Sequence, residues 1–183
     1  MPLSGYSADL PGDILLDTGV FYVGAAVLGA TRGAPRFDPG KSFSNIDFDG
    51  KRADIMGLHR VDKWEPVISA TLLEFDAVDL ARFEAGSTFA GTTTVIHTPK
   101  RAGILLVAAD YITDLRLIFE RGAAVISYAA IHFPKALVRR YQVAGNKDDI
   151  GLMEAEFLAV LDMSGANNLA DCPYKIELRD ALP

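Results

Sequence analysis

Apolar residues in this chain recur mostly at every second position or in short runs, which is typical of β-strands. Residues 152–162 show the alternation most clearly. One set of alternate positions is wholly apolar: Met153, Ala155, Phe157, Ala159 and Leu161. The other set is mixed: Leu152, Glu154, Glu156, Leu158 and Val160. Because successive side chains of a strand point to opposite faces, one face of this segment is predicted to cover a core.

Similar apolar runs predict further strands along most of the chain. They lie at residues 20–23, 26–28, 67–75, 92–97, 104–108, 112–119, 124–133 and 137–143. The first two are expected to form a tight hairpin at Gly24-Ala25, and a turn-rich connection at residues 144–149 is expected to join the last of them to residues 152–162. The pattern therefore predicts a mainly β protein.

One short helix is indicated at residues 76–86. Asp76 is a suitable N-cap, Asp79 falls in the first turn, and Gly86 is a suitable terminator. Leu80 and Phe83 give the segment one apolar side. A helix this short is unstable alone, so it is expected to pack on the flank of the sheet.

Residues 32–66 have a different character from the strands around them. They contain several prolines and glycines, both signs of charge, and apolar residues that look exposed: Phe37, Phe43, Ile46, Phe48, Ile55, Met56, Leu58 and Trp64. Asp49-Gly50 is a suitable tip for a hairpin between residues 44–48 and 51–55. Such a long, aromatic segment is expected to dock on another subunit, and the alternative is a surface loop that packs on its own domain.

The ends of the chain are less regular than its middle. Residues 1–16 form an N-terminal segment, and residues 163–183 read as a C-terminal arm with one short strand at residues 174–178. We expect the whole chain, residues 1–183, to be a single domain. No secretory signal is expected, and the apolar runs 19–30 and 122–131 are too short for a bilayer, so a soluble protein made in the cytoplasm is predicted.

Composition and charge narrow the function classes. Half of the 183 residues are hydrophobic, as in globular proteins, and the formal net charge is −6. An acidic surface disfavours a DNA-binding regulator, because phosphates are bound by Lys and Arg. It is compatible with a surface that DNA passes without sticking. Cys172 is the single cysteine, so an internal disulfide is excluded.

No motif for catalysis, cofactor or metal binding is complete. Gly40-Lys41-Ser42 imitates a phosphate-binding loop, but Pro35 stands where its first glycine is needed. Asp47-Phe48-Asp49-Gly50 lacks the distal ligands of a calcium loop. His59, His97 and His132 have no metal-ligand spacing, and the pair Glu154 and Glu156 is more typical of a solvated or interface face. We therefore expect no enzyme activity, no cofactor and no metal.

Several stretches in order resemble one known family. They are residues 18–24, 33–37, 39–40, 46–52, 55–58 and 68–75. The most distinctive are Asp49-Gly50-Lys51-Arg52 and Leu72-Leu73-Glu74-Phe75, which leads directly into the predicted helix. This order is similar to that of the major tail tube proteins of long-tailed (siphovirus-like) bacteriophages, over residues 17–162.

The resemblance implies a β-sandwich or barrel with one short flanking helix, a long inter-subunit hairpin and a C-terminal arm. It implies hexameric rings that stack into the tail tube, the conduit through which DNA enters the host. The chain would then be assembled in the host cytoplasm and reside in the virion, with itself, a tape measure protein and tail terminator or distal tail proteins as partners. Membrane association is not expected.

The resemblance assigns subunit contacts to the segment 32–66. The candidate interface residues are Phe43, Ile46, Phe48, Asp49, Lys51, Arg52 and Trp64. Interface energy is usually concentrated in a few aromatic and aliphatic anchors of this kind. Three alternatives remain open: another ring-forming tail component, a secretion-system tube protein, and a β-barrel that binds a small ligand.

Overall fold

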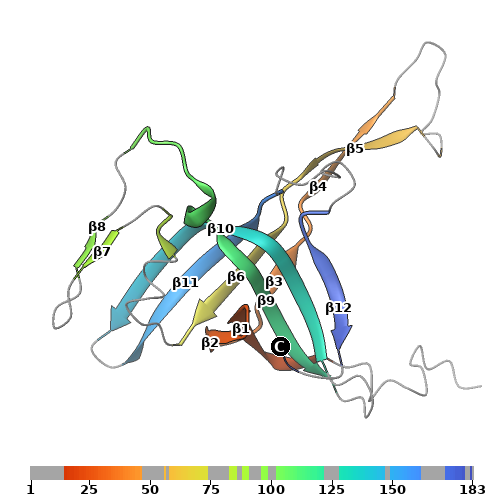
Figure 1. Ribbon diagram of the computed structural model, residues 1–183. Coiled ribbons are helices and arrows are strands. Elements are labelled where there is room, and N and C mark those ends of the chain that lie inside the picture. Colours follow the sequence, from red (N-terminus) through yellow and green to blue (C-terminus); the bar gives the residue numbers. More distant parts are fainter. Residues whose placement is uncertain are drawn as a thin grey trace, which may run out of the picture.

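A computed structural model describes residues 15–46, 56, 58–73, 83–85, 88–90, 96–98, 102–121, 128–146, 149–161, 172–179 and 182. Most of the described residues lie in β-strands, and almost none are helical (Figure 1). The strands are β1 (Leu15–Val23), β2 (Ala26–Ala30), β3 (Arg36–Asp38), β4 (Lys41–Asn45), β5 (His59–Trp64), β6 (Val67–Leu72), β7 (Thr88–Ala90), β8 (Ile96–Thr98), β9 (Ile112–Arg121), β10 (Tyr128–Asn146), β11 (Asp149–Ala159) and β12 (Lys175–Arg179). A 3₁₀ turn, η1 (Ala108–Asp110), precedes β9.

The main sheet has the order β2-β1-β9-β10-β11-β6-β3, and β12 pairs with β10 beside this path. Its neighbours are antiparallel throughout. The first hairpin turns where the sequence predicts, since Val23 is opposite Ala26 and Gly24 has the left-handed φ of 63°. The prediction of a mainly β protein is therefore confirmed.

The long strand β10 corrects one sequence prediction. Residues 124–133 and 137–143 were expected to be separate strands, yet β10 runs through Pro134 without a break. Two strands share one edge of β10. The first residue of β12, Lys175, is opposite His132, and the last residue of β11, Ala159, is opposite Ala136. Pro134 lies in the gap between them, where the absence of its N–H disrupts no ladder on that side.

On its other edge β10 faces Asp114, whose φ of 62° is the one positive value outside glycine among the described residues. The backbone carbonyl of Asp114 turns away from β10 and accepts a hydrogen bond from the N–H of Gly24 at 3.0 Å. This irregularity in β9 accommodates Pro134 on the second edge, because no hydrogen bond is needed there either.

The sheet curls so that its two halves face each other. Thr31, at the end of β2, forms an isolated antiparallel bridge with Leu72 of β6. Its buried hydroxyl donates to the carbonyl of Gly19 at 2.7 Å, and the N–H of Arg32 donates to Thr71 at 2.8 Å. These contacts join strands that are far apart in the sheet order and give the barrel-like sandwich that the resemblance implies.

The core lies between the two halves. Phe21 of β1 packs on Phe157 of β11 with ring centroids 5.1 Å apart, and Phe157 also meets Phe83 at 5.8 Å. The apolar face predicted for residues 152–162 is buried at Met153, Ala155, Phe157 and Ala159. Leu161 falls beyond the strand and is 38% exposed.

Other sequence predictions are confirmed in part. Residues 67–75, 112–119 and 174–178 correspond to β6, β9 and β12, and residues 96 and 97 belong to β8. Most of the predicted helix, residues 76–82 and 86, lies outside the described residues. Phe83 is helical and buried. None of the helices described here is long and apolar enough to cross a membrane.

The prediction of a strand at residues 104–108 is wrong. Residues 104–107 form no regular structure, and η1 follows. The Asp110 carboxylate accepts a hydrogen bond from the N–H of Val107 at 2.7 Å, which fixes a local turn instead of an extended ladder. Ile104, Leu105 and Val107 are exposed, so their apolar character does not mark a buried strand.

Candidate assembly interface

Strands β4 and β5 form a two-stranded hairpin that is not part of the main sheet. Figure 1 shows it extending away from the main sheet, at the upper right. The hairpin lies within residues 32–66, where the sequence predicts a docking segment. A two-stranded hairpin is only marginally stable by itself in water, so a hairpin in this position needs a further source of stability.

The pairing of the hairpin corrects the predicted one. Residues 44–48 were expected to pair with residues 51–55, but Ser44 and Asn45 pair with Arg60 and His59. The N–H of Ile46 also donates to Leu58 at 2.9 Å. The prediction took Asp49-Gly50 as a two-residue turn, whereas the paired strands leave a connection from residue 47 to 57. Asp49-Gly50 and residues 51–55 lie outside the described residues.

One face of the hairpin, its apolar face, carries an exposed pair of apolar residues. Phe43 is directly opposite Val61, and directly opposed residues share a face of the ribbon. Phe43 is 63% exposed and Val61 41% exposed. Ile46, just past the end of β4, is 54% exposed. Exposed apolar side chains gathered on one projecting element are typical of an interaction surface.

Polar contacts define the other side of the hairpin. The Arg60 guanidinium contacts the Asp62 carboxylate at 2.8 Å. Hydrogen bonds from the Ser44 side chain and from Arg60 lower the pKa of the Asp62 carboxyl below its ordinary value. Asp62 is also the extra residue of a bulge, since Ser42 pairs with Lys63 and Phe43 pairs with Val61. Because Asp62 is left without a partner position, Val61 stands opposite Phe43 and the two share a face.

The base of the hairpin is tied to the body by aromatic rings. Trp64 is partly buried and lies 6.3 Å from Tyr174, which packs edge-on against Phe37 at 5.0 Å. The Lys41 ammonium lies 4.9 Å from the centre of the Trp64 ring. Trp64 therefore contacts its own chain at the root of the hairpin.

Gly40 sets the direction in which the hairpin leaves the sheet. Its φ is 55°, its N–H donates to the Asp38 carboxylate at 2.8 Å, and its carbonyl accepts from the N–H of Glu65 at 3.0 Å. A Cβ at this position would clash with the backbone carbonyl of Glu65. Only glycine fits this close approach between the two ends of the hairpin.

The candidate interface residues fall into three groups. Phe43 and Ile46 are exposed on the hairpin. Trp64 lies at its base. The remaining four lie outside the described residues: Phe48, Asp49, Lys51 and Arg52. Sequence reasoning missed Val61, because it stands between Arg60 and Asp62 and reads as part of a polar stretch.

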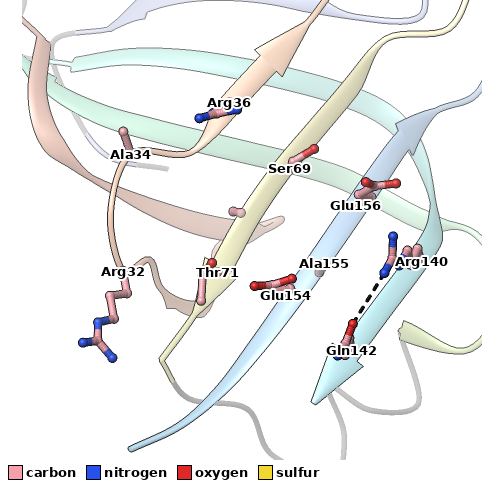
Figure 2. Close-up of a pocket in the computed structure, with 11 residues that line it drawn as sticks. Arg32, Ala34, Arg36, Ser69, Thr71, Arg140, Gln142, Glu154, Ala155 and Glu156 are labelled. Atoms are coloured by element: carbon pink, nitrogen blue, oxygen red, sulfur yellow. Dashed lines mark hydrogen bonds between the residues drawn. The ribbon is translucent and has the colours of Figure 1, made fainter. Parts of the chain in front are cut away.

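A second feature is a pocket of about 220 Å³ on the outer face of the main sheet. Figure 2 shows Arg32 and Arg36 on one side of it and Arg140 on the other, with Glu154 and Glu156 of β11 between them. Arg140 donates to Gln142 at 3.5 Å. The alternating charges suit a polar contact surface.

Within the described ranges, no three His, Cys, Asp or Glu side chains are grouped so that they would hold a metal ion. Cys172 is an exposed free thiol. The exposed hairpin is therefore the feature that most needs a functional explanation.

The likeness of this chain to known proteins lies in its fold. No protein-family profile and no curated protein matches the sequence. Among solved structures, the fold is similar to the anti-feeding prophage cap, a tube terminating cap, with 9% identity over 97% of this chain and 99% of that chain. The TM-score of 0.47 reflects a loose agreement of fold, too distant to carry a role from one protein to the other.

Proposed function

We propose that this chain is a structural protein of a phage tail, and that its copies assemble into hexameric rings that stack into the tail tube. The proposal combines the resemblance of the sequence to major tail tube proteins with one structural observation. That observation is the projecting hairpin β4–β5, which carries Phe43 and Val61 on an exposed apolar face.

The hairpin gains stability when a second copy covers it. Burying one large apolar side chain contributes roughly 1.5–3 kcal/mol, and Phe43 and Val61 leave water together if they meet the same partner surface. A contact of this kind repeated in every subunit favours a large assembly over free subunits. The hairpin thus acts as the anchor of the subunit contact.

The position of the hairpin favours a head-to-tail contact. It projects from one end of the molecule, so the surface that it meets on the next copy differs from the hairpin itself. Such heterologous contacts form closed rings when the rotation closes and stacked fibres when it does not. A tube needs both kinds of contact.

The other parts of the proposal follow from the tube. A formal net charge of −6 is compatible with a conduit that DNA passes without binding. The chain would reside in the virion tail, with a tape measure protein and tail terminator or distal tail proteins as partners. Other ring components of a tail, or of a secretion system, share the same assembly logic and differ in whether their rings stack.

Assembly of the purified protein tests the proposal. The wild-type chain should form rings or tubes in negative-stain electron micrographs above a threshold concentration. The double variant Phe43→Ser, Val61→Thr should remain a folded monomer at the same concentration, with an unchanged far-UV circular dichroism spectrum. The matched control is Val27→Thr, a change of the same type at a 56% exposed position of β2, which should assemble as the wild type does.

Two outcomes contradict the proposal. Tubes of normal length from the double variant would show that the apolar face of the hairpin is not the contact. A wild-type chain that stays monomeric at every concentration and binds a small apolar molecule would favour a ligand-binding barrel instead.

A further inference from the structure

A histidine between two carboxylates joins three strands on the outer face of the main sheet. His132 of β10 has its Nε2 atom 2.8 Å from Oδ1 of Asp114 in β9. Its Nδ1 atom lies 3.0 Å from Oε1 of Glu177 in β12. The His132 side chain is 13% exposed, and both carboxylates are 31% exposed. The arrangement is therefore sheltered from solvent on the histidine side.

Both contacts are attractive only when both ring nitrogens carry a proton. A neutral imidazole has one N–H, so its other nitrogen would place a lone pair against a carboxylate oxygen. The imidazolium form is attracted to both carboxylates. The same face carries three cations: Arg116 on β9, which lies 2.9 Å from Asp114, and Lys175 and Arg179 on β12, where Arg179 is 3.8 Å from Glu177. It also carries the carboxylate of Glu120 on β9, at the position opposite Tyr128.

Strand β12 has few other attachments to the body. It has five residues and, among the described strands, pairs with β10 alone. Its residues Ile176 and Leu178 are 64% and 60% exposed, so apolar burial contributes little to holding it. The contact between Glu177 and His132 is thus the principal side-chain tie between β12 and the sheet in the described structure.

The N-terminal end of β12 leads directly to the hairpin. Lys175 is opposite His132, and the preceding residue, Tyr174, packs on Phe37 and Trp64. The side chain of Tyr174 thus supports the base of β4–β5, while the clamp formed by Asp114, His132 and Glu177 holds the strand that follows it. A displacement of β12 would move Tyr174 away from Trp64.

We infer that the clamp of Asp114, His132 and Glu177 is a positioning device that fixes the direction of the β4–β5 hairpin through β12 and Tyr174. The role of that direction in assembly rests on the proposed function above, but the coupling itself is a property of the single chain. When His132 contacts both Asp114 and Glu177, the apolar face of the hairpin is held in one orientation. Loss of either carboxylate contact leaves the base of the hairpin loosely held.

The single tryptophan of the chain reports the coupling directly. Trp64 emission and its quenching by acrylamide are measured on dilute, unassembled protein. Glu177→Ala and His132→Gln should shift the emission maximum to longer wavelength and increase quenching, because Trp64 loses the support of Tyr174. Tyr174→Ala should produce the same change by removing the contact itself. Glu154→Ala, which removes an exposed carboxylate from β11, should leave both readings unchanged.

The outcomes separate this inference from the proposed function. If Glu177→Ala and His132→Gln fold with wild-type circular dichroism and keep wild-type emission and quenching, the coupling is overturned, whatever the protein assembles into. The same holds if Tyr174→Ala leaves Trp64 emission unchanged. If the emission changes as expected but the wild-type chain forms no rings, the coupling stands and the proposed function fails.

Discussion

Phe43 of β4 and Val61 of β5 lie directly opposite each other on a hairpin that projects from the main sheet, and both side chains are exposed. Cross-strand pairs of this kind stabilise a ribbon only modestly, by a fraction of a kcal/mol to about 1 kcal/mol. A facing pair of apolar residues gains far more when a second surface covers it. The proposed subunit contact is therefore apolar in character.

An apolar contact responds to salts in a characteristic way. Ammonium sulfate should lower the threshold concentration for assembly, because excluded salts strengthen apolar burial, and low concentrations of urea should raise it. Light scattering against protein concentration measures the threshold. If ion pairs held the subunits together, about 1 M NaCl would dissolve the assemblies, since the Debye length falls there to about 3 Å. Dissolution by NaCl with an unchanged fold would contradict the apolar contact.

Gly40 is predicted to be irreplaceable at the base of the hairpin. Gly40→Ala introduces a Cβ that clashes with the Glu65 carbonyl, and it also places alanine at a φ of 55°. The change should break the hydrogen bond from Glu65 to Gly40 and redirect the hairpin. We expect normal folding of the main sheet, loss of assembly and faster proteolysis within the hairpin, measured by limited digestion and mass spectrometry.

Gly24→Ala is the matched control for this change. Gly24 has a similar φ of 63°, but nothing lies within 4 Å of the position that its Cβ would occupy. The substitution therefore carries the backbone strain of about 1 kcal/mol without the clash. It should lower the thermal midpoint slightly and leave assembly intact. Equal effects of the two variants would show that the close approach of Gly40 to Glu65 is unimportant.

The sequence predicts the main sheet well where one face of a strand is buried. Residues 152–162 and 112–119 alternate because their inner positions fill the core, and they are strands β11 and β9. The prediction failed where local signals competed with pairing. Separate strands were predicted on the two sides of residues 134–136, but β10 passes Pro134 because its neighbours on both edges leave that position unpaired.

The candidate site was predicted in outline but not in detail. Glycines, prolines and exposed aromatics indicated a projecting hairpin, and the described strands β4 and β5 form one. The partner strand was placed too close in the chain, because Asp49-Gly50 is a strong turn signal on its own. The contact of Trp64 with Tyr174 joins residues far apart in the sequence, and no periodicity or motif encodes such a contact.

Phe157 is predicted to carry a large part of the stability of the fold. It is fully buried and meets Phe21 and Phe83, so Phe157→Ala should lower the free energy of unfolding by about 3–5 kcal/mol. Urea denaturation followed by circular dichroism measures the loss. Phe43→Ala removes the same side chain from an exposed position and should change the free energy of unfolding of the monomer by less than about 0.5 kcal/mol. Similar losses in the two variants would contradict the assignment of Phe43 to the surface.

Acid is predicted to loosen the polar side of the hairpin. The Ser44 side chain and Arg60 hold the pKa of Asp62 below its ordinary value of 3.8. Because the folded-state pKa is the lower one, these hydrogen bonds stabilise the hairpin at pH values above 3.8, and their contribution is lost as the pH falls through the folded-state pKa. A carboxyl ¹³C NMR titration should therefore give Asp62 a midpoint below 3.8.

Two substitutions separate the causes of that shift. Ser44→Ala removes the largest cause and should raise the midpoint of Asp62 toward 3.8, and Arg60→Gln should raise it by a smaller amount. Ser44→Ala should also weaken assembly, because the hydrogen bond between Ser44 and Asp62 joins β4 to β5 and so keeps Phe43 beside Val61. The contact of Arg60 with Asp62 lies within β5, so Arg60→Gln should affect assembly less. A midpoint of Asp62 that does not move in either variant would mean that the Ser44 and Arg60 contacts do not persist in solution. The hairpin would then depend on its apolar face and its aromatic base alone.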